Sequence, residues 1–324
     1  MSAIFDYIIL LFELALPVSL LALGIFLTYR ILDFADLTAE GSLLIGASLT
    51  GLMIVIGLNP FLATFIGAIG GAVCGLITGL LNRILKIPKL LSGIITMTAS
   101  SSIAMLIMGF DFPTGFLNNY LSLGENATFY SLFYVSEETN KAFINSVGFS
   151  LNQCIEIIVM AIIVVGVIFA LYYFFGTEYG MAIRNTGMNE KMAKSQGINT
   201  TIATIACVAI SNAVIGLGGA LYVQVNHSIE VGDFSGYLVV GLASILVGEA
   251  IFGKRSFKNW LISVSLGALV YFIIIAFAQV VIKVKPGLMQ LLYAVLIVVA
   301  LCLPTIKKWV VNLFKKKDEP IKEV

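Results

Sequence analysis

The chain has 324 residues, of which 59% are hydrophobic and 11% are charged, and its mean hydropathy is +1.02. A soluble domain of this length could not bury so much apolar surface, so the composition excludes a water-soluble globular protein and indicates a polytopic membrane protein. The formal net charge of +1 is uninformative by itself, because the distribution of the charges carries the information.

Apolar windows of about 20 residues predict an all-α bundle of about nine membrane spans, roughly eight to ten. The spans are expected at 7–28, 41–58, 61–81, 90–109, 155–175, 201–225, 237–252, 260–282 and 287–304. The first span is expected to stay in the membrane, because it lacks the positive start of a cleavable signal peptide. The segments 41–58 and 237–252 are short for a span and are predicted to tilt, break or re-enter.

The positively charged residues predict the orientation of these spans. Most Lys and Arg fall into the C-terminal tail and four connections, which the positive-inside rule assigns to the cytoplasm. The connections are 29–40, 82–89, 176–200 and 253–259. This arrangement places the C-terminus inside and the N-terminus outside. The long 110–154 connection is then external and is expected to fold over the outer mouth.

Small residues mark helix faces that can pack closely. Gly67, Gly71, Gly75 and Gly79 recur at every fourth residue and so form one stripe on the 61–81 span. The stripe predicts tight packing against another helix, and a sliding surface for alternating access is a compatible interpretation. The segments that follow Thr38 and Asn199 are both rich in small residues, which suggests two pseudo-equivalent halves.

The segment 30–41 is denser in charge than its surroundings. It is either an ordinary interfacial loop or a break between helices whose backbone and hydroxyl groups face a cavity. Under the second interpretation, Asp36, Thr38 and Glu40 are candidate residues of a substrate path.

Two further acidic residues, Glu13 and Glu249, lie inside apolar runs, where a carboxylate is costly. We expect Glu13 to sit at an interface or to pair with a neighbouring helix. Glu249 lies one helical turn from Lys254 and Arg255, so local pairing near the inner interface is expected.

The sequence contains no pattern that indicates a catalytic or a metal-binding site. Residues 248–255 nearly match a phosphate-binding loop, but Arg255 replaces the required hydroxyl and the segment ends a membrane helix. His227 is the single histidine and has no clustered partner for a metal site or a catalytic triad. We therefore predict no catalytic residue, no metal site and no ATP hydrolysis by this chain.

The segment 180–199 is a polar island between two long apolar runs. Asn189 suits a helix N-cap, Glu190 the positive first turn, Lys194 the negative last turn and Gly197 a left-handed stop. These signals predict a two-turn helix near 190–196, although a solvated loop is the alternative. Its contact face is expected to consist of Met192, Ala193 and Gln196.

Residues 180–199 resemble the cytoplasmic coupling motif of ABC-importer permeases, and most closely that of the branched-chain amino-acid and ribose-type family. The matching positions are Gly180, Ala182, Arg184, Thr186, Gly187, Asn189, Met192, Ala193, Gly197, Ile198 and Asn199. Met181, Ile183 and Lys194 depart from the family pattern. Residues 29–42 and 249–256 resemble a narrower branch that is associated with tryptophan or tyrosine uptake. The likeness covers roughly residues 10–305.

This resemblance implies a multi-pass permease of the bacterial plasma membrane, with one transmembrane domain over 1–305 and a cytoplasmic basic tail over 306–324. It implies a second permease subunit, expected to be identical, an ABC ATPase that carries ATP and magnesium, and an extracellular substrate-binding lipoprotein. The chain itself would bind no cofactor and no nucleic acid, and lipid would surround it. Coupling to the ATPase would involve Arg184, Gly187, Asn189, Glu190, Met192, Ala193, Gln196 and Gly197.

ATP would close the ATPase dimer, move the coupling helix and reorient the spans. The same machinery could instead carry branched-chain amino acids, a sugar or a nucleoside. A secondary transporter is less consistent with the sequence, because few candidate ion-coupling groups lie at mid-membrane. A membrane enzyme would need a nucleophile, a metal cluster or paired carboxylates, and the sequence suggests none.

Overall fold

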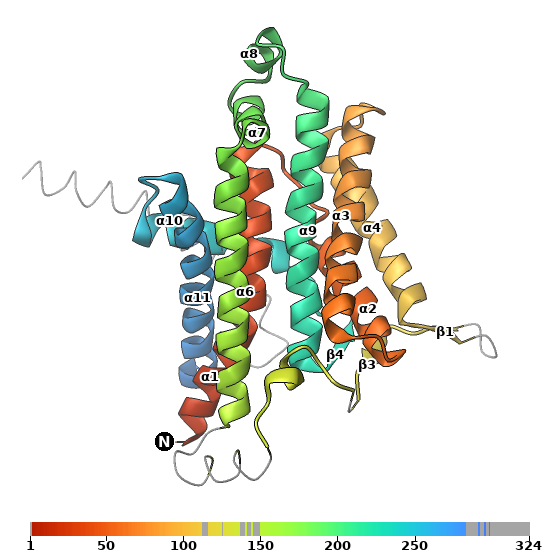
Figure 1. The fold of residues 1–324 in the computed structure, drawn as a ribbon, viewed down its shortest axis with the longest axis vertical. Helices are drawn as coiled ribbons and strands as arrows, with labels where there is room; N and C mark the ends of the chain where they lie inside the picture. The colour runs from red at the N-terminus through yellow and green to blue at the C-terminus, as the bar shows by residue number, and fades with distance from the viewer. Residues whose placement is uncertain are drawn as a thin grey trace, which may run out of the picture.

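The computed structural model describes residues 2–282 except 112–115, 125, 137–139, 141–143 and 145–149, together with residues 291, 295 and 298. The chain forms a bundle of helices, most of which run along its long axis, with short strand pairs at one end (Figure 1). In the described residues, six helices are long and apolar enough to cross a membrane, and two shorter apolar helices accompany them. The predicted polytopic helix bundle is confirmed.

The eight apolar helices match the first eight predicted spans to within a few residues. They are α1 (Ser2–Phe26), α2 (Ala39–Val55), α3 (Pro60–Arg83), α4 (Lys89–Met108), α6 (Leu151–Gly176), α9 (Thr200–Asn226), α10 (Tyr237–Phe252) and α11 (Phe257–Ile282). A π-helical turn, η1 (Leu27–Ile31), extends α1, and two short helices, α7 (Glu178–Met188) and α8 (Glu190–Ser195), connect α6 to α9. The ninth predicted span, 287–304, and the tail 306–324 lie outside the residues described as continuous structure.

Parts of the long 110–154 connection fold back onto one end of the bundle. Strand β1 (Phe110–Asp111) pairs with β2 (Phe116–Leu117), and β3 (Tyr120–Ser122) pairs antiparallel with β4 (Ser228–Glu230). A 3₁₀ turn, η2 (Tyr130–Phe133), follows, and the amide of Phe129 donates to Gln224 of α9 at 2.7 Å. The described parts of this connection therefore cover the bundle end opposite α7 and α8 (Figure 1).

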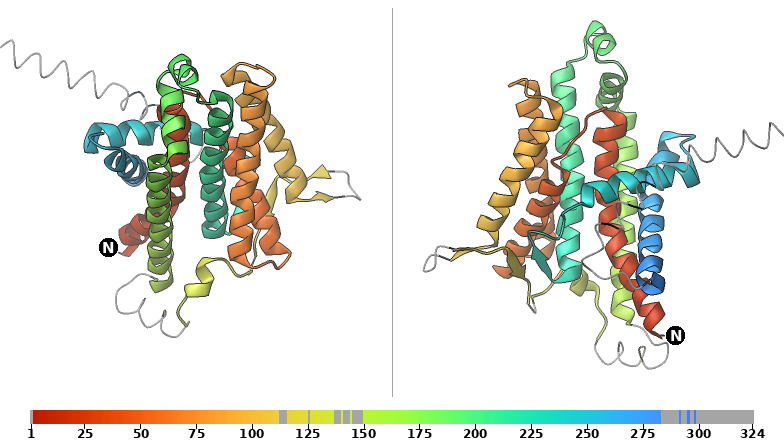
Figure 2. Two further views of the ribbon diagram at one scale, coloured as in Figure 1. Left: turned by 45° about the horizontal axis from the view of Figure 1, so that its top comes forward. Right: turned by 180° about the vertical axis from the view of Figure 1, so that it is seen from behind.

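The helices form two groups that repeat the same packing pattern. Helix α3 packs against α2 and α9, and α11 packs against α10 and α1. Helices α1 and α9 run in opposite directions, as do α3 and α11 (Figures 1 and 2). Matching contacts and opposite directions are expected of an inverted repeat that pairs α1, α2 and α3 with α9, α10 and α11. This pairing differs from the likeness that the sequence suggested between the segments after Thr38 and Asn199, and the suggestion of two pseudo-equivalent halves stays a prediction.

The four-residue glycine stripe of α3 lies against neighbouring backbone. A Cβ at Gly71 would overlap with the carbonyl oxygen of Asn212 in α9, and one at Gly75 with the carbonyl oxygen of Val208. A Cβ at Gly67 would overlap with the Thr50 hydroxyl of α2, and one at Gly79 would lie 3.0 Å from the Cα of Ile205. Because each side chain is absent, α3 and α9 approach with their backbones in contact.

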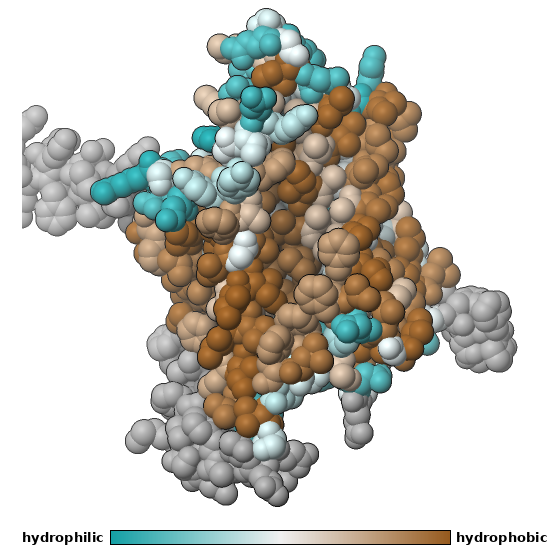
Figure 3. Space-filling view, viewed as in Figure 1, coloured by the Kyte–Doolittle hydropathy of each residue, from teal (hydrophilic) through white to brown (hydrophobic). Residues whose placement is uncertain are grey.

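The face of the molecule shown in Figure 3 is apolar along the length of the bundle and more polar at its two ends. Large apolar side chains are exposed on α3 and α6, including Phe65 at 62% and Phe169 at 70%, as expected for helices that face lipid. Every Lys and Arg of the described residues belongs to η1, the 82–89 connection, the α7–α8 region or the 253–258 segment. These segments gather at the end where α7 and α8 lie (Figure 1).

Candidate functional site

Helix α7 lies directly on the end of α6 and on η1 because two glycines remove the intervening side chains. Thr177 caps the helix, since its hydroxyl accepts a hydrogen bond from the amide of Gly180 at 3.3 Å. A Cβ at Gly180 would overlap with the backbone of Phe174 and Phe175, and a Cβ at Gly187 with the carbonyl oxygen of Ile31. Helix α7 therefore links the end of α6 to the turn that follows α1.

Helix α8 has well-defined signals at both ends. The Asn189 side chain accepts a hydrogen bond from the amide of Met192 at 3.1 Å, which caps the N-terminus. At the other end, Gly197 adopts φ +81° and its amide donates to Lys194 O at 3.0 Å, while the Ile198 amide donates to Ala193 O at 3.1 Å. This pair of bonds is a Schellman motif, which stops the helix. The helix predicted near 190–196 is confirmed as Glu190–Ser195, with Gln196 as its C-cap.

Glu190 connects α8 to two of the long helices. Its Oε1 atom lies 2.8 Å from Nη1 of Arg83, at the end of α3, and accepts from the Thr200 hydroxyl at 3.3 Å. The second guanidinium nitrogen of Arg83 donates to the Thr204 hydroxyl of α9 at 2.6 Å. Lys194 forms a further ion pair with Glu190 at 3.0 Å, one helical turn away. A short helix that would be unstable alone is thus fixed to α3 and α9.

These neighbours keep Glu190 ionised. The hydrogen bond from Lys194, followed by the contacts with Arg83, lowers the pKa of Glu190 from 4.5 to about 2 against the opposing effect of burial. The Lys194 side chain is 61% exposed, whereas that of Arg83 is 16% exposed. Water and salt weaken an exposed pair, so Arg83 is the more important partner in fixing α8.

The predicted coupling residues divide into an exposed group and a buried one. Met192 is 57% exposed and Gln196 is exposed, so both can reach a partner protein. Ala193 is only 1% exposed, so its assignment to the contact face is wrong. It lies on the inner side of α8, where any partner is excluded by the rest of the chain.

Two exposed apolar residues of this region belong to no pattern that the sequence shows clearly. Tyr179 is 81% exposed and Met188 is 85% exposed. Ile183 and Thr186 define the buried face of α7, and Met188 lies on the opposite face. The helical periodicity of α7 indicates which face carries Met188, but α7 has too few apolar residues for this pattern to be clear from the sequence.

Arg184 projects from α7 toward α11. Its guanidinium carbon lies 4.9 Å from the centroid of the Phe257 ring, within the range of a cation–π interaction. The side chain is exposed, so its N–H groups remain available to a ligand.

The candidate path residues lie at the start of α2, inside the bundle. Asp36 accepts from the Thr38 amide at 2.9 Å and from Nδ2 of Asn212 at 2.7 Å. The Thr38 hydroxyl bonds to the Thr78 hydroxyl at 2.7 Å. Asp36 and Thr38 are 6% and 0% exposed, so in this conformation their polar groups bond within the protein. The break between helices is present, and a role in a substrate path stays a prediction.

Glu40 joins the start of α2 to the start of α10. Its Oε1 atom accepts hydrogen bonds from the amides of Gly236 and Leu238, each at 3.1 Å. These amides belong to the first turn of α10, whose partial positive charge favours a carboxylate. Figure 2 shows that α10 crosses the bundle at a steep angle to the long helices. Glu40 therefore fixes α2 to this crossing helix.

The structure gives Glu249 a partner other than the one predicted. Glu249 accepts from Arg30 of η1 at 2.6 Å and from the Trp260 indole at 2.9 Å, so its predicted pairing with Lys254 and Arg255 is wrong. Its true partner is distant in sequence and comes close because α1, which η1 extends, packs against α10.

Glu13 is 4% exposed, and its Oε1 atom has no hydrogen-bond partner among the described residues. It lies near Glu156 of α6, which bonds to the Tyr134 hydroxyl. The expected pairing with a neighbouring helix is thus not found for this oxygen. Among the residues that the structure describes, no group of three His, Cys, Asp or Glu side chains could hold a metal ion.

Residues 7–301 match the protein family described as the permease component of the branched-chain amino acid transport system. The chain belongs to this permease family of ABC transporters. This permease is 32% identical over 266 residues to the tyrosine transport system permease protein of Clostridioides difficile strain R20291, a match that covers 82% of this chain and 80% of the relative.

A shorter match links the permease to the nucleoside ABC transporter permease protein NupC of Lactococcus lactis, with 35% identity over 91 residues, or 28% of this chain and 27% of the relative. Among solved structures, PsaBC from Streptococcus pneumoniae in complex with Fab aligns with a TM-score of 0.47 and 12% identity, covering 91% of this chain and 89% of that chain.

Proposed function

We propose that this permease is the membrane subunit of an ATP-driven importer for tyrosine or tryptophan, and that α8 is its contact with a separate ATPase. The similarity to a tyrosine transport permease over most of both chains supports the aromatic cargo. The observation that carries the coupling role is the fixed, capped helix α8, which stands at the polar end of the bundle with Met192 exposed (Figure 1).

The connections of α8 provide a route for force. The ion pair between Glu190 and Arg83 links α8 to α3. The hydrogen bond from Arg83 to the Thr204 hydroxyl links both of these helices to α9. Through α7 and Gly187, the same region rests on η1, which leads to the start of α2. When ATP closes the ATPase dimer, displacement of α8 biases the bundle between two packings.

In this proposal an external binding protein delivers the amino acid, and a second permease subunit, expected to be identical, completes the pathway. The second subunit would cover part of the exposed apolar surface of the bundle. Asp36, Thr38 and Glu40 would reach the cargo only in a conformation that opens their internal hydrogen bonds.

The cargo is tested by reconstituting the permease with its ATPase and binding protein in proteoliposomes. We expect uptake of labelled tyrosine or tryptophan, competition by the other aromatic amino acids, and no competition by leucine, ribose or a nucleoside. The short match to a nucleoside permease makes the nucleoside the most informative competitor. Competition by the nucleoside alone would refute the aromatic cargo and leave the permease assignment intact.

The coupling role is tested by Met192→Asp, which places a charge on the exposed face of α8. We expect membrane insertion to be normal and both ATPase co-purification and uptake to be lost. Met192→Leu, which keeps an apolar side chain of similar volume, is the matched control and should retain both activities. Normal uptake by Met192→Asp would refute the assignment of α8.

A further inference from the structure

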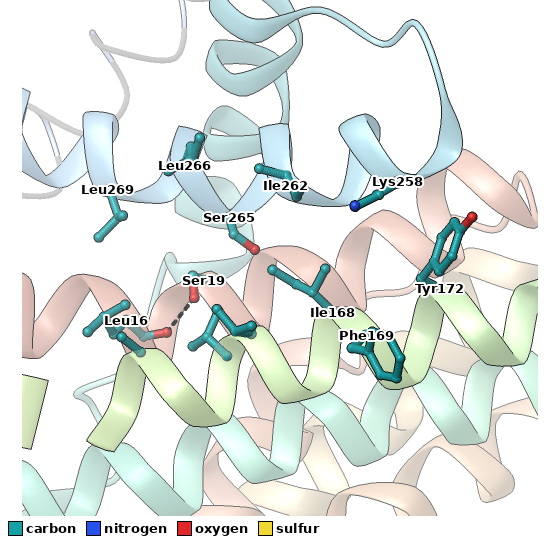
Figure 4. A pocket seen from close by; sticks show the side chains of 13 residues that line it. Leu16, Ser19, Ile168, Phe169, Tyr172, Lys258, Ile262, Ser265, Leu266 and Leu269 are labelled. Atoms are coloured by element: carbon teal, nitrogen blue, oxygen red, sulfur yellow. Dashed lines mark hydrogen bonds between the residues drawn. The ribbon is translucent and has the colours of Figure 1, made fainter. Parts of the chain in front are cut away.

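A long apolar groove runs along the outside of the bundle between α1, α6 and α11. It has a volume of about 490 Å³ and is lined mainly by aliphatic and aromatic side chains, among them Ile168, Ile262 and Leu266 (Figure 4). Its Ser19 hydroxyl donates to the carbonyl oxygen of Leu16 at 2.6 Å and so needs no further partner. On the α6 side, Val165 and Phe169 are 64% and 70% exposed, which shows that the groove opens on the lipid-facing surface.

The groove leads into a second cavity of a different chemical character. This second cavity has a volume of about 600 Å³ and shares Tyr172 and Lys258 with the groove. It adds Arg184 and Ser256, so its lining is cationic and rich in hydroxyl groups. Figure 4 shows Lys258 and Tyr172 at one end of the groove and Leu16 and Leu269 at the other. An apolar groove that continues into a cavity lined by two cations has the shape and charge of a site for an anionic amphiphile.

The position of the cations identifies the occupant further. Arg184 and Lys258 lie at the bundle end where the Lys and Arg of the described residues gather. Basic pockets between membrane helices at the cytoplasmic surface attract anionic lipid head groups. The guanidinium of Arg184 stacks on Phe257, and this stacking leaves its N–H edge free for a phosphate oxygen.

The cargo proposed above does not fit this site. An amino acid carries an ammonium group that needs an acidic or carbonyl partner when it leaves water. No acidic residue lines either cavity in the described part of the chain. The site also opens toward lipid on the flank of the bundle, where the binding protein has no access.

We propose that the two cavities together bind one anionic phospholipid, with an acyl chain in the groove and the phosphate between Arg184 and Lys258. The lipid contacts α6 and α11 in the membrane and α7 at the polar end. Because α7 rests on η1 through Gly187, the bound head group stabilises the helix that leads to α8. The lipid site does not depend on the identity of the cargo.

The purified permease–ATPase complex in detergent provides the test. Native mass spectrometry after addition of phosphatidylglycerol or phosphatidylethanolamine should show one phosphatidylglycerol retained per permease and weaker retention of phosphatidylethanolamine. Lys258→Gln should weaken phosphatidylglycerol binding about fivefold, and Lys258→Arg should restore it. Lys254→Gln is the matched control, because Lys254 stacks on Trp260 and lines neither cavity.

A second pair of variants tests the acyl-chain groove. Ala161 lines the groove, so Ala161→Trp should fill it and abolish retention of the lipid. Gly166→Trp on the same helix is the control, because a Cβ there meets no atom within 4 Å and the residue does not line the groove. ATPase co-purification reports whether each variant has folded.

Three results would overturn the proposal. Equal retention of the two phospholipids that is insensitive to Lys258→Gln would mean ordinary surrounding lipid. Equally tight binding of the deacylated head group, glycerophosphoglycerol, would mean that the groove holds no acyl chain. Full retention by a folded Ala161→Trp variant would place the lipid elsewhere.

Discussion

At the scale of single residues, α8 depends on backbone conformation as much as on side chains. Gly197 has φ +81°, and a Cβ at this position would meet no atom within 4 Å. The requirement for glycine is therefore purely conformational, because an L-residue is strained at positive φ even where space is available.

Gly197→Val should destabilise the stop of α8 by about 1–2 kcal/mol, because a β-branched residue tolerates positive φ poorly. We expect uptake and ATPase co-purification to fall together while the amount of protein in the membrane is unchanged. Gly197→Asn is the matched control, since asparagine adopts the left-handed conformation more readily. Equal uptake by the valine and asparagine variants would show that the Schellman motif does not matter for coupling.

Glu190 should hold α8 in place across the physiological pH range. Because folding lowers the pKa of Glu190 from 4.5 to about 2, its stabilising contribution is fully present above pH 4.5 and is lost as the pH falls through about 2. A spin label on Lys191→Cys should therefore report the same mobility of α8 from about pH 5 to about pH 9.

In the same labelled protein, Glu190→Gln should increase the mobility of α8 at neutral pH, because Arg83 loses its ionised partner. Lys194→Gln should change it little, since Lys194 is 61% exposed. A larger effect of the lysine change would contradict the view that Arg83 is the main partner.

At the scale of secondary-structure elements, the carboxylate of Glu40 joins α2 to α10. Glu40→Ala would leave the half-buried amides of Gly236 and Leu238 without their acceptor. A fully buried unpaired amide costs about 1–3 kcal/mol and a half-buried one costs less, so we expect a moderate decrease in the unfolding temperature of the purified permease.

Glu40→Gln keeps an acceptor oxygen and should lower the unfolding temperature less than Glu40→Ala. Glu178→Ala removes an exposed glutamate from the first turn of α7 and serves as the control for the loss of a carboxylate. If the Glu40 and Glu178 alanine variants unfold at the same temperature, the link between α2 and α10 is unimportant for stability.

The elements differ in how far the sequence could predict them. The two ends of α8 were predictable because Asn189 and Gly197 act on backbone groups only a few residues away. The burial of Ala193 was not, because it depends on which side of α8 meets the rest of the protein. The bond from Glu40 to Gly236 joins residues 196 positions apart, and no local pattern contains that information.

At the scale of the whole molecule, the positive charges predict which end faces the cytoplasm. Single cysteines can test this after Cys74, Cys154, Cys207 and Cys302 have been replaced by serine. A membrane-impermeant maleimide should label Gly232→Cys in intact cells and Ser195→Cys only after permeabilisation, because the two positions lie at opposite ends of the bundle (Figure 1). The reverse pattern would invert the orientation and remove α8 from the reach of a cytoplasmic ATPase.

The positions and extent of the eight apolar helices in the described part of the chain followed from hydropathy, because a bilayer imposes a minimum length on any helix that crosses it. Hydropathy did not indicate which helices of the two halves pair with each other, since inverted helices can occupy equivalent packing positions without sequence similarity. The partner of Glu249 could not be predicted from the sequence either, because the packing of α1 against α10 determines which basic side chain reaches it.

The backbone contact between α3 and α9 restricts how the transporter can change shape. The glycines of α3 that approach α9 most closely recur every four residues, which corresponds to about 6 Å along a helix. A smaller axial displacement would bring the bulkier residues between the glycines against the carbonyl groups of α9. We therefore expect α3 and α9 to travel as one rigid body during a transport cycle, and the relative displacement of the two halves to occur at other contacts.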